Sequence, residues 1–160
     1  MTDVYECLLS KMEYVDGRLI WAKPHKSALL GKDVGRRDKN GYWRVHVTGT
    51  MVSAHRLIFF KFHRYIPDFV DHIDGDPSNN RIENLRAADR SGNSRNCKTP
   101  VTNKTGIKGV YWHGSAGRWT ASIRINKKLT HLGTFQDVFS AACARRSAEI
   151  THYGEFAREI

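Results

Sequence analysis

Cysteine is scarce in this sequence, and long apolar runs are absent. The three cysteines, Cys7, Cys97 and Cys143, lie far apart and form no CxxC pair. This spacing disfavours a zinc knuckle or a disulfide framework and is typical of a reducing compartment. The longest apolar runs, such as residues 57–60, are too short to cross a membrane, and the first residues do not resemble a signal peptide. We therefore expect a cytoplasmic protein without a membrane partner.

Acidic residues are too few to balance the basic ones. The 26 Lys and Arg residues exceed the 16 Asp and Glu residues by ten. No basic tail holds this excess, because residues 1–100 and residues 101–160 each carry a net charge of +5. Such a surplus favours an anionic polymer as partner. A soluble basic protein without such a partner is the alternative that charge alone leaves open.

The first third of the chain has the pattern of short strands separated by turns. Two dipeptides that favour tight hairpin turns, Asp16-Gly17 and Asn40-Gly41, adjoin runs of strand-forming residues. Residues 54–65 are expected to form a helix that ends before Pro67. The apolar residues at helical spacing in it are Leu57, Ile58 and Phe62.

The next segment is expected to form two short strands around a polar loop. The strands cover residues 69–73 and 82–86, and the loop covers residues 74–80. Asp89 is a suitable N-cap for a helix that follows.

Asp71 and His72 stand side by side in the first of these strands, where apolar residues are expected. A carboxylate is a ligand for a hard cation. A histidine, with an unperturbed pKa of about 6.5, suits a general base near neutral pH. A surface Asp beside a hydrogen-bonded structural His is the alternative for an isolated pair.

The wider pattern is more specific. Asp71-His72-Ile73-Asp74-Gly75-Asp76, followed by Asn84 and Asn93, closely resembles the HNH endonuclease family over about residues 55–96. The resemblance implies a ββα-metal fold, in which two strands and a helix surround one divalent ion. It implies that His72 is the general base and that Asn84 pins the loop that orients this base. It also implies that Asp71 and Asn93 are the metal ligands.

Few protein ligands and several waters suit Mg²⁺, with Mn²⁺ or Ni²⁺ as alternatives, and no small-molecule cofactor is expected.

Asp74 and Asp76 are interpreted as turn-forming residues, because Asp-Gly and Asp-Pro are turn dipeptides. His55 is interpreted as structural, and Arg86 is expected to contact DNA.

Residues 98–106 are polar and are the best candidate for a linker. Beyond them, residues 118–126 alternate strictly, which predicts a half-buried strand with a basic outer face. Residues 107–113 and 129–132 are expected to flank this strand, and Asp137 is expected to cap an alanine-rich helix.

This last part resembles the AP2/ERF DNA-binding domain over about residues 104–154. The resemblance implies a three-stranded sheet that enters the major groove and is backed by one helix. Several arginines of that family are replaced here by Tyr111, Ser122 and Leu129, which implies an altered or weaker sequence preference. The DNA-facing residues implied by the resemblance are Lys108, Tyr111, His113, Arg118, Ser122, Arg124 and His131.

The sequence thus predicts an α+β protein in two small parts. An HNH nuclease domain with a β-rich N-terminal extension covers residues 1–97, with its core at about 55–97. An AP2-like domain covers residues 107–160. This order resembles the free-standing HNH homing endonucleases common in bacteriophages. It implies a metal-dependent endonuclease that cuts double-stranded DNA, in the host cytoplasm if the gene belongs to a phage. The alternatives are a non-catalytic DNA-binding regulator with a vestigial nuclease core and a nuclease directed at RNA.

Overall fold

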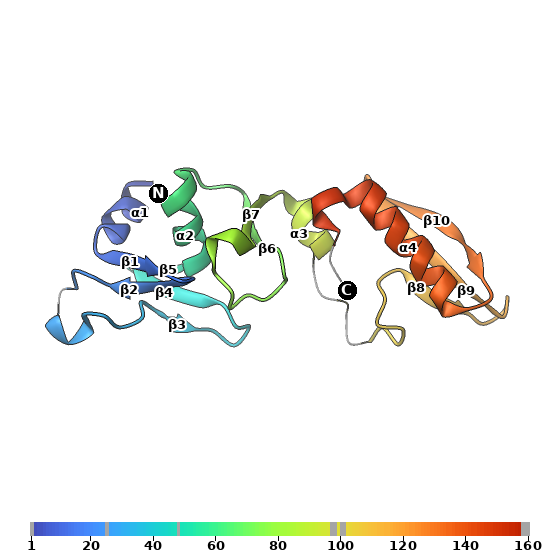
Figure 1. The fold of residues 1–160 in the computed structure, drawn as a ribbon, viewed down its shortest axis with the longest axis horizontal. Coiled ribbons are helices and arrows are strands. Elements are labelled where there is room, and N and C mark those ends of the chain that lie inside the picture. The colour runs from blue at the N-terminus through green and yellow to red at the C-terminus, as the bar shows by residue number, and fades with distance from the viewer. Residues whose placement is uncertain (1, 25, 48, 97–98, 100–101, 158–160) are drawn as a thin grey trace. The chain divides into compact units, whose positions relative to one another are not determined.

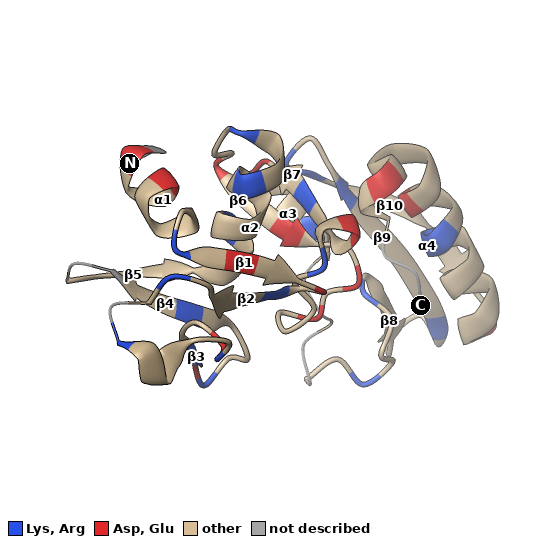
Figure 2. Cartoon of the chain, turned by 60° about the vertical axis from the view of Figure 1, so that its left-hand side comes forward, with Lys and Arg blue, Asp and Glu red and all other residues tan. Residues whose placement is uncertain are grey.

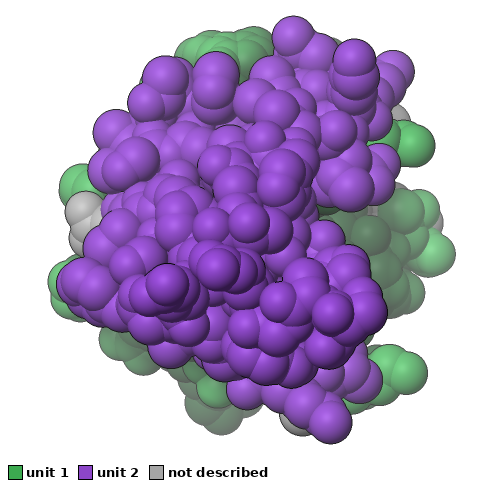
Figure 3. All heavy atoms as spheres, turned by 90° about the vertical axis from the view of Figure 1, so that its right-hand side faces the viewer, with its two compact units in different colours: residues 1–94 green, residues 95–160 purple. Residues whose placement is uncertain are grey.

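Short helices and small antiparallel sheets alternate along the chain in the computed structural model (Figure 1), which is compatible with the predicted α+β class. The structure describes residues 2–24, 26–47, 49–96, 99 and 102–157. The chain divides into two compact units, Met1–Ser94 and Arg95–Ile160, which Figure 3 colours separately. None of the helices in the described ranges is long and apolar enough to span a membrane.

The first unit is built around a helix that contacts strands of three small antiparallel sheets. Leu57 and Ile58 of this helix are completely buried and lie in the main apolar core. The elements before the site are α1 (Thr2–Leu9), β1 (Met12–Val15), β2 (Arg18–Trp21), the 3-10 turn η1 (Ser27–Leu29), β3 (Arg36–Arg37), β4 (Trp43–Val47), β5 (Thr50–Ser53) and α2 (Ala54–His63). The elements after α2 are β6 (Phe69–His72), the 3-10 turn η2 (Ile82–Asn84), β7 (Leu85–Ala88) and α3 (Arg90–Asn96).

The predicted hairpin turn at Asp16-Gly17 is confirmed. Both residues have positive φ, 48° and 82°, and Val15 pairs with Arg18 across the turn. This is the geometry for which Asp-Gly is favoured. Asn40-Gly41 likewise lies in the turn between β3 and β4, where Arg37 pairs with Trp43.

The expectation that the first third of the chain, from residue 5 to residue 54, consists of short strands is wrong for its first segment. Residues 5–9 belong to α1, and Tyr5 is buried edge-on against Phe60 of α2, with ring centroids 5.5 Å apart. Burial against α2 therefore selects a helix at this position.

Helix α2 is shorter than predicted, and a different set of residues is buried. It ends at His63, and Arg64 caps it in the left-handed conformation, so Pro67 is not the cause of its end. Phe62 is 47% exposed, whereas Phe59 and Phe60 are buried. The apolar face of α2 therefore excludes Phe62.

The second predicted strand of the site region also begins later than expected. Residues 82–84 form η2, and strand β7 starts at Leu85. Strands β6 and β7 are antiparallel, with Asp71 opposite Arg86 and His72 opposite Leu85. Helix α3 follows as expected, and the Asp89 carboxylate accepts a hydrogen bond from the backbone N–H of Gly92.

The second unit is a three-stranded antiparallel sheet with one long helix packed on it. The helix begins at the predicted cap, because the Asp137 carboxylate accepts from the backbone N–H of Ser140 at 2.8 Å. Ala141 is fully buried against Val110 and Ala121 of the sheet. The elements are β8 (Val110–His113), β9 (Arg118–Ile125), β10 (Lys128–Phe135), α4 (Val138–Tyr153) and the 3-10 turn η3 (Gly154–Phe156), in the sheet order β10-β9-β8.

The flanking strands of this sheet differ in length from the prediction. β8 begins only at Val110, because residues 103–107 form a turn in which the Asn103 amide donates to the Ile107 carbonyl at 3.0 Å. β10 extends to Phe135, with a register shift between His131 and Gly133. Of the expected linker, residues 98, 100 and 101 lie outside the described residues.

Candidate active site

His72 ends strand β6 with its side chain buried, at 5% exposure. Its Nε2 lies 2.9 Å from the amide Oδ1 of Asn80, which is also buried. The rings of His55 and Tyr42 lie close by, with centroids 5.0 and 6.0 Å from that of His72. The contacts that hold the imidazole thus include a hydrogen bond to Asn80 and contacts with both of these rings.

Asn84 closes the polar loop that follows His72. Its side-chain NH₂ donates to the Asp74 carboxylate at 3.0 Å and to the Asn79 carbonyl at 2.8 Å, while its Oδ1 accepts from the Asp74 backbone N–H. The Asn84 backbone carbonyl accepts from the N–H of Ile73, the residue after His72. One asparagine thus ties both ends of the loop together.

Asp74 is engaged within this loop, as its interpretation as a turn residue requires. It accepts from the backbone N–H of Asp76 at 2.8 Å and from the Asn79 amide at 2.7 Å. Burial acts to raise the pKa of Asp74, but the hydrogen bonds from Asp76, Asn79 and Asn84 outweigh it and lower the pKa. The Asp76 carboxylate accepts from Ser78.

Asp71 is buried and forms an ion pair across the two strands. Arg86 donates to its Oδ2 through Nε at 3.0 Å and through Nη2 at 2.9 Å. The side chains of Arg86 and Asp71 are only 12% and 8% exposed. Arg86 is the residue that we expected to contact DNA. In the structure, its guanidinium pairs with the carboxylate of Asp71, the expected metal ligand.

The donor chemistry of this site fits a hard divalent cation. Asp71 offers a carboxylate from β6, and the half-buried Asn93 offers an amide oxygen from α3. Within the described part of the chain, no group of three or more His, Cys, Asp or Glu side chains could hold a metal. Mg²⁺ is commonly bound by one or two protein oxygens together with substrate phosphate and water.

His55 lies on the buried face of α2, next to His72. Burial is the main cause that lowers its pKa to about 3, and the charges of His72, Arg56 and Arg44 act in the same direction. His55 is therefore neutral at physiological pH, which agrees with its interpretation as structural. The Tyr42 ring lies 5.7 Å from the His55 ring, and neither Tyr42 nor Asn80 was singled out by the sequence pattern.

The second unit places most of the expected DNA-reading residues on one sheet face. Paired residues share a face in an antiparallel sheet, and the face of Val110 and Ala121 packs on α4. The residues expected at DNA that lie on the opposite face are Tyr111, His113, Arg118, Ser122, Arg124 and His131. The structure brings these six together, and Lys and Arg residues occur on both units (Figure 2).

Two of the residues expected to contact DNA, Ser122 and Lys108, form hydrogen bonds within the second unit. Ser122 is buried, and its hydroxyl donates to the Gly109 carbonyl at 3.4 Å. Lys108 precedes β8, and its ammonium donates to the Arg95 carbonyl at 3.4 Å. On the same face as Ser122, the Thr120 hydroxyl is buried and has no hydrogen-bond partner among the described residues.

Comparison with known proteins agrees with the location of the first of these sites. Residues 52–95 match the family model of the HNH endonucleases. Protein 3.8 of Escherichia phage T7 is 34% identical over 90 residues, which are 56% of this chain and 74% of the phage protein. No solved structure matches the chain. The family match includes Asp71, His72, Asn84, Arg86 and Asn93, and it ends before the sheet of the second unit.

Proposed function

Because this chain belongs to the HNH endonuclease family, we propose that it is a metal-dependent endonuclease that hydrolyses phosphodiester bonds in double-stranded DNA. The observation that carries this proposal is the arrangement around His72. Asn80 and Asn84 fix the imidazole and the loop that follows it. A general base needs this kind of fixed orientation.

In the proposed reaction, His72 takes a proton from a water molecule, and the oxygen of that water attacks the phosphorus. The bond from phosphorus to the leaving sugar oxygen then breaks, and this oxygen receives a proton from solvent. Asn84 keeps the loop closed so that the imidazole stays aligned with the water. When bound to Asp71 and Asn93, a divalent cation would neutralise charge on the scissile phosphate and on the leaving oxygen.

The proposal assigns residues 55–97 to a ββα-metal finger, in which β6, β7 and α3 would supply the residues that hold the cation. Strand β6 carries both Asp71 and His72, and α3 carries Asn93. Mg²⁺ is the proposed ion because the protein offers oxygen ligands and few of them. Mn²⁺ and Ni²⁺ are the alternatives, since amide and imidazole groups also suit transition metals.

The sheet of the second unit is the proposed reader of the target, in the manner of an AP2-like domain. Its face away from α4 carries two arginines and two histidines, and arginine suits guanine edges in the major groove. The unpartnered Thr120 hydroxyl on this face supports the proposal, because a buried polar group favours a ligand that completes its hydrogen bonding. Such a module would give the nuclease a site preference, as a homing endonuclease requires.

One observation favours a second candidate, a DNA-binding regulator without nuclease activity. Arg86 already compensates the charge of Asp71, as it would in a core that binds no metal. Supercoiled plasmid incubated with the protein, with Mg²⁺ or with EDTA, separates the two candidates. The nuclease gives relaxed or linear DNA only with Mg²⁺, whereas a regulator shifts the plasmid on a gel and leaves it supercoiled.

A further inference from the structure

Asn80 is the hydrogen-bond partner of His72, although the sequence pattern indicates only a turn residue at this position. Its side chain is 2% exposed, and its Oδ1 lies 2.9 Å from Nε2 of the imidazole. An amide oxygen can only accept a hydrogen bond, so this contact is a hydrogen bond in the tautomer in which Nε2 carries the hydrogen. In a neutral imidazole the other nitrogen, Nδ1, is then the basic one.

We propose that Asn80 is a positioning residue that holds His72 in the Nε2–H tautomer and thereby assigns proton abstraction to Nδ1. This inference rests on the proposed nuclease function. The wrong tautomer would present an N–H to the water instead of a lone pair, so the ring could not act as a base in that orientation. Asn80 itself touches neither water nor phosphate in this account and acts only through His72.

The N-terminal hairpin holds the segment that carries Asn80. The backbone N–H of Ile82 donates to the Tyr14 hydroxyl at 3.1 Å, and Arg81 pairs with Asp16 at 2.8 Å. A Cβ on Gly17 would lie only 2.9 Å from the Arg81 backbone nitrogen. The hairpin turn can therefore approach residues 80–82 only because position 17 lacks a side chain.

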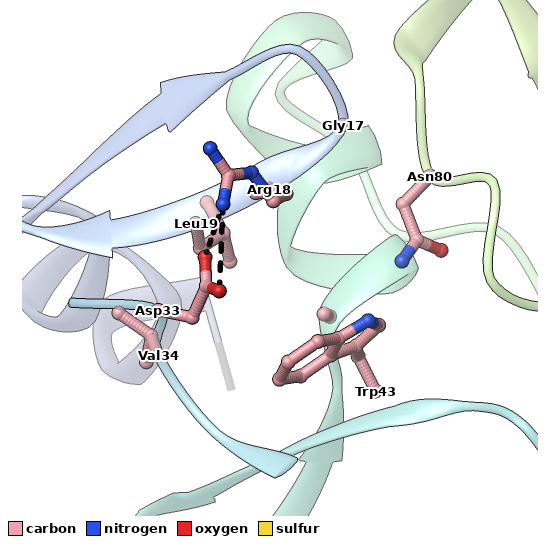
Figure 4. A pocket seen from close by; sticks show the side chains of 8 residues that line it. Gly17, Arg18, Leu19, Asp33, Val34, Trp43 and Asn80 are labelled. Carbon is pink, nitrogen blue, oxygen red and sulfur yellow. Dashed lines mark hydrogen bonds and ion pairs between the residues drawn. The ribbon is translucent and has the colours of Figure 1, made fainter. Parts of the chain in front are cut away.

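The Asn80 side chain also lines a pocket between the hairpin and β4. Asn80 lines this pocket together with Gly17 and Trp43, and Figure 4 shows its side chain reaching toward the Trp43 indole. On the other side, His72 contacts the rings of His55 and Tyr42, and it interacts electrostatically with Asp74, whose pKa it helps to lower. Asn80 is thus enclosed on the hairpin side and bonded on the imidazole side.

The tautomer can be read directly by long-range ¹H–¹⁵N NMR spectra of the histidine-labelled full-length protein at pH 8. The wild type should show the His72 hydrogen on Nε2. Asn80→Leu, which keeps the size but removes the acceptor, should give a mixture of tautomers. Asn80→Asp, which keeps an acceptor oxygen, should retain the Nε2–H form.

Single-turnover cleavage of DNA with Mg²⁺ gives the functional readout. Asn80→Leu should lower the rate by about 10-fold to 100-fold, in the range for lost orienting partners of a functional histidine, with unchanged DNA affinity. Asn80→Asp should recover most of the rate. A wild-type His72 with its hydrogen on Nδ1 would overturn the proposal whether or not any variant folds. Wild-type cleavage rates in Asn80→Leu would overturn it as well. A wild-type protein that binds but never cuts DNA contradicts the proposed nuclease function instead, and the spectrum still decides the tautomer.

Discussion

Asp71 and Arg86 face each other across β6 and β7, and the guanidinium donates two hydrogen bonds to one carboxylate oxygen, Oδ2, at 3.0 and 2.9 Å. Both side chains are nearly buried. Removing one member of a buried ion pair is costly, because it leaves a desolvated charge behind. A divalent cation at Asp71 would have to share this carboxylate with Arg86 or displace it.

Arg86→Met should therefore destabilise the metal-free protein and make its stability depend on Mg²⁺. The expected loss is about 3 kcal/mol in the free energy of unfolding, and added Mg²⁺ should restore part of it by supplying positive charge to Asp71. Urea denaturation with and without Mg²⁺ measures both effects. Arg18→Met is the matched control, because the pair of Arg18 with Asp33 is exposed and contributes less than about 1 kcal/mol. Equal stability of the two variants would contradict the account.

Asn93→Ala should raise the Mg²⁺ concentration needed for half-maximal cleavage, and excess metal should partly rescue the rate. A neutral amide is a weak ligand, so DNA phosphate must contribute to the binding of the ion. Asn93→His should keep activity but shift the preference toward Ni²⁺ or Mn²⁺, because imidazole suits transition metals. Cleavage titrated with each ion decides this. Identical Mg²⁺ curves for wild type and Asn93→Ala would remove Asn93 from the site and make Asn96 the next candidate.

Arg124→Ala should change the DNA preference of the protein at one or a few bases, at about 1–3 kcal/mol if the guanidinium reads a guanine edge. Binding to a library of duplexes at several salt concentrations measures this. A loss that is uniform across sequences, with a salt slope flatter by about 0.9, would mean that Arg124 holds a phosphate instead. Lys128→Ala is the control, because Lys128 pairs with Ile125 on the α4 side of the sheet. Equal effects of both changes would contradict the assignment of the reading face.

His55 should make the protein less stable in mild acid. Its folded pKa is lowered to about 3, whereas an unfolded histidine takes up a proton near pH 6.5. The contribution of the neutral, buried His55 to the free energy of unfolding is therefore complete above about pH 6.5. It is lost as the pH falls toward 3, because the unfolded state then binds a proton that the folded state does not. Between pH 7.5 and 5, the wild type should lose about 2 kcal/mol more unfolding free energy than His55→Phe.

Chemical denaturation at the two pH values tests this, with His46→Phe as the control, since His46 is exposed on β4. The control should lose as much stability as the wild type. If His55→Phe also matches the wild type, the burial of a neutral imidazole is not the source of the acid sensitivity.

Local sequence signals predicted the features that depend on neighbouring residues. Asp16-Gly17 forms its turn because both residues tolerate positive φ. Asp137 caps α4, and the alternation in β9 correctly separates Ala121 on the helix side from Arg124 on the other. Each of these depends on residues within a few positions in the chain.

The missed features depend on partners that are distant in the chain. Tyr5 lies in a helix because Phe60 of α2 provides its contact. Arg145 is buried in an alanine-rich helix because its guanidinium donates to the Ser122 carbonyl, beside a glycine at position 109 that leaves room for it. Asn80 lies in a run of polar turn residues, and nothing local in the sequence marks it as the one that is buried against His72.

The central claim is that His72 performs the chemistry and contributes little to DNA affinity, and cleavage and binding by His72→Ala test it most directly. DNA binding should stay near the wild-type level, because the imidazole acts on water and neutralises little phosphate charge. The cleavage rate with saturating Mg²⁺ should fall by about 10²–10⁴, the usual cost of losing a general base. Cleavage by His72→Ala at the wild-type rate, under the conditions in which the wild type cuts, would contradict the account.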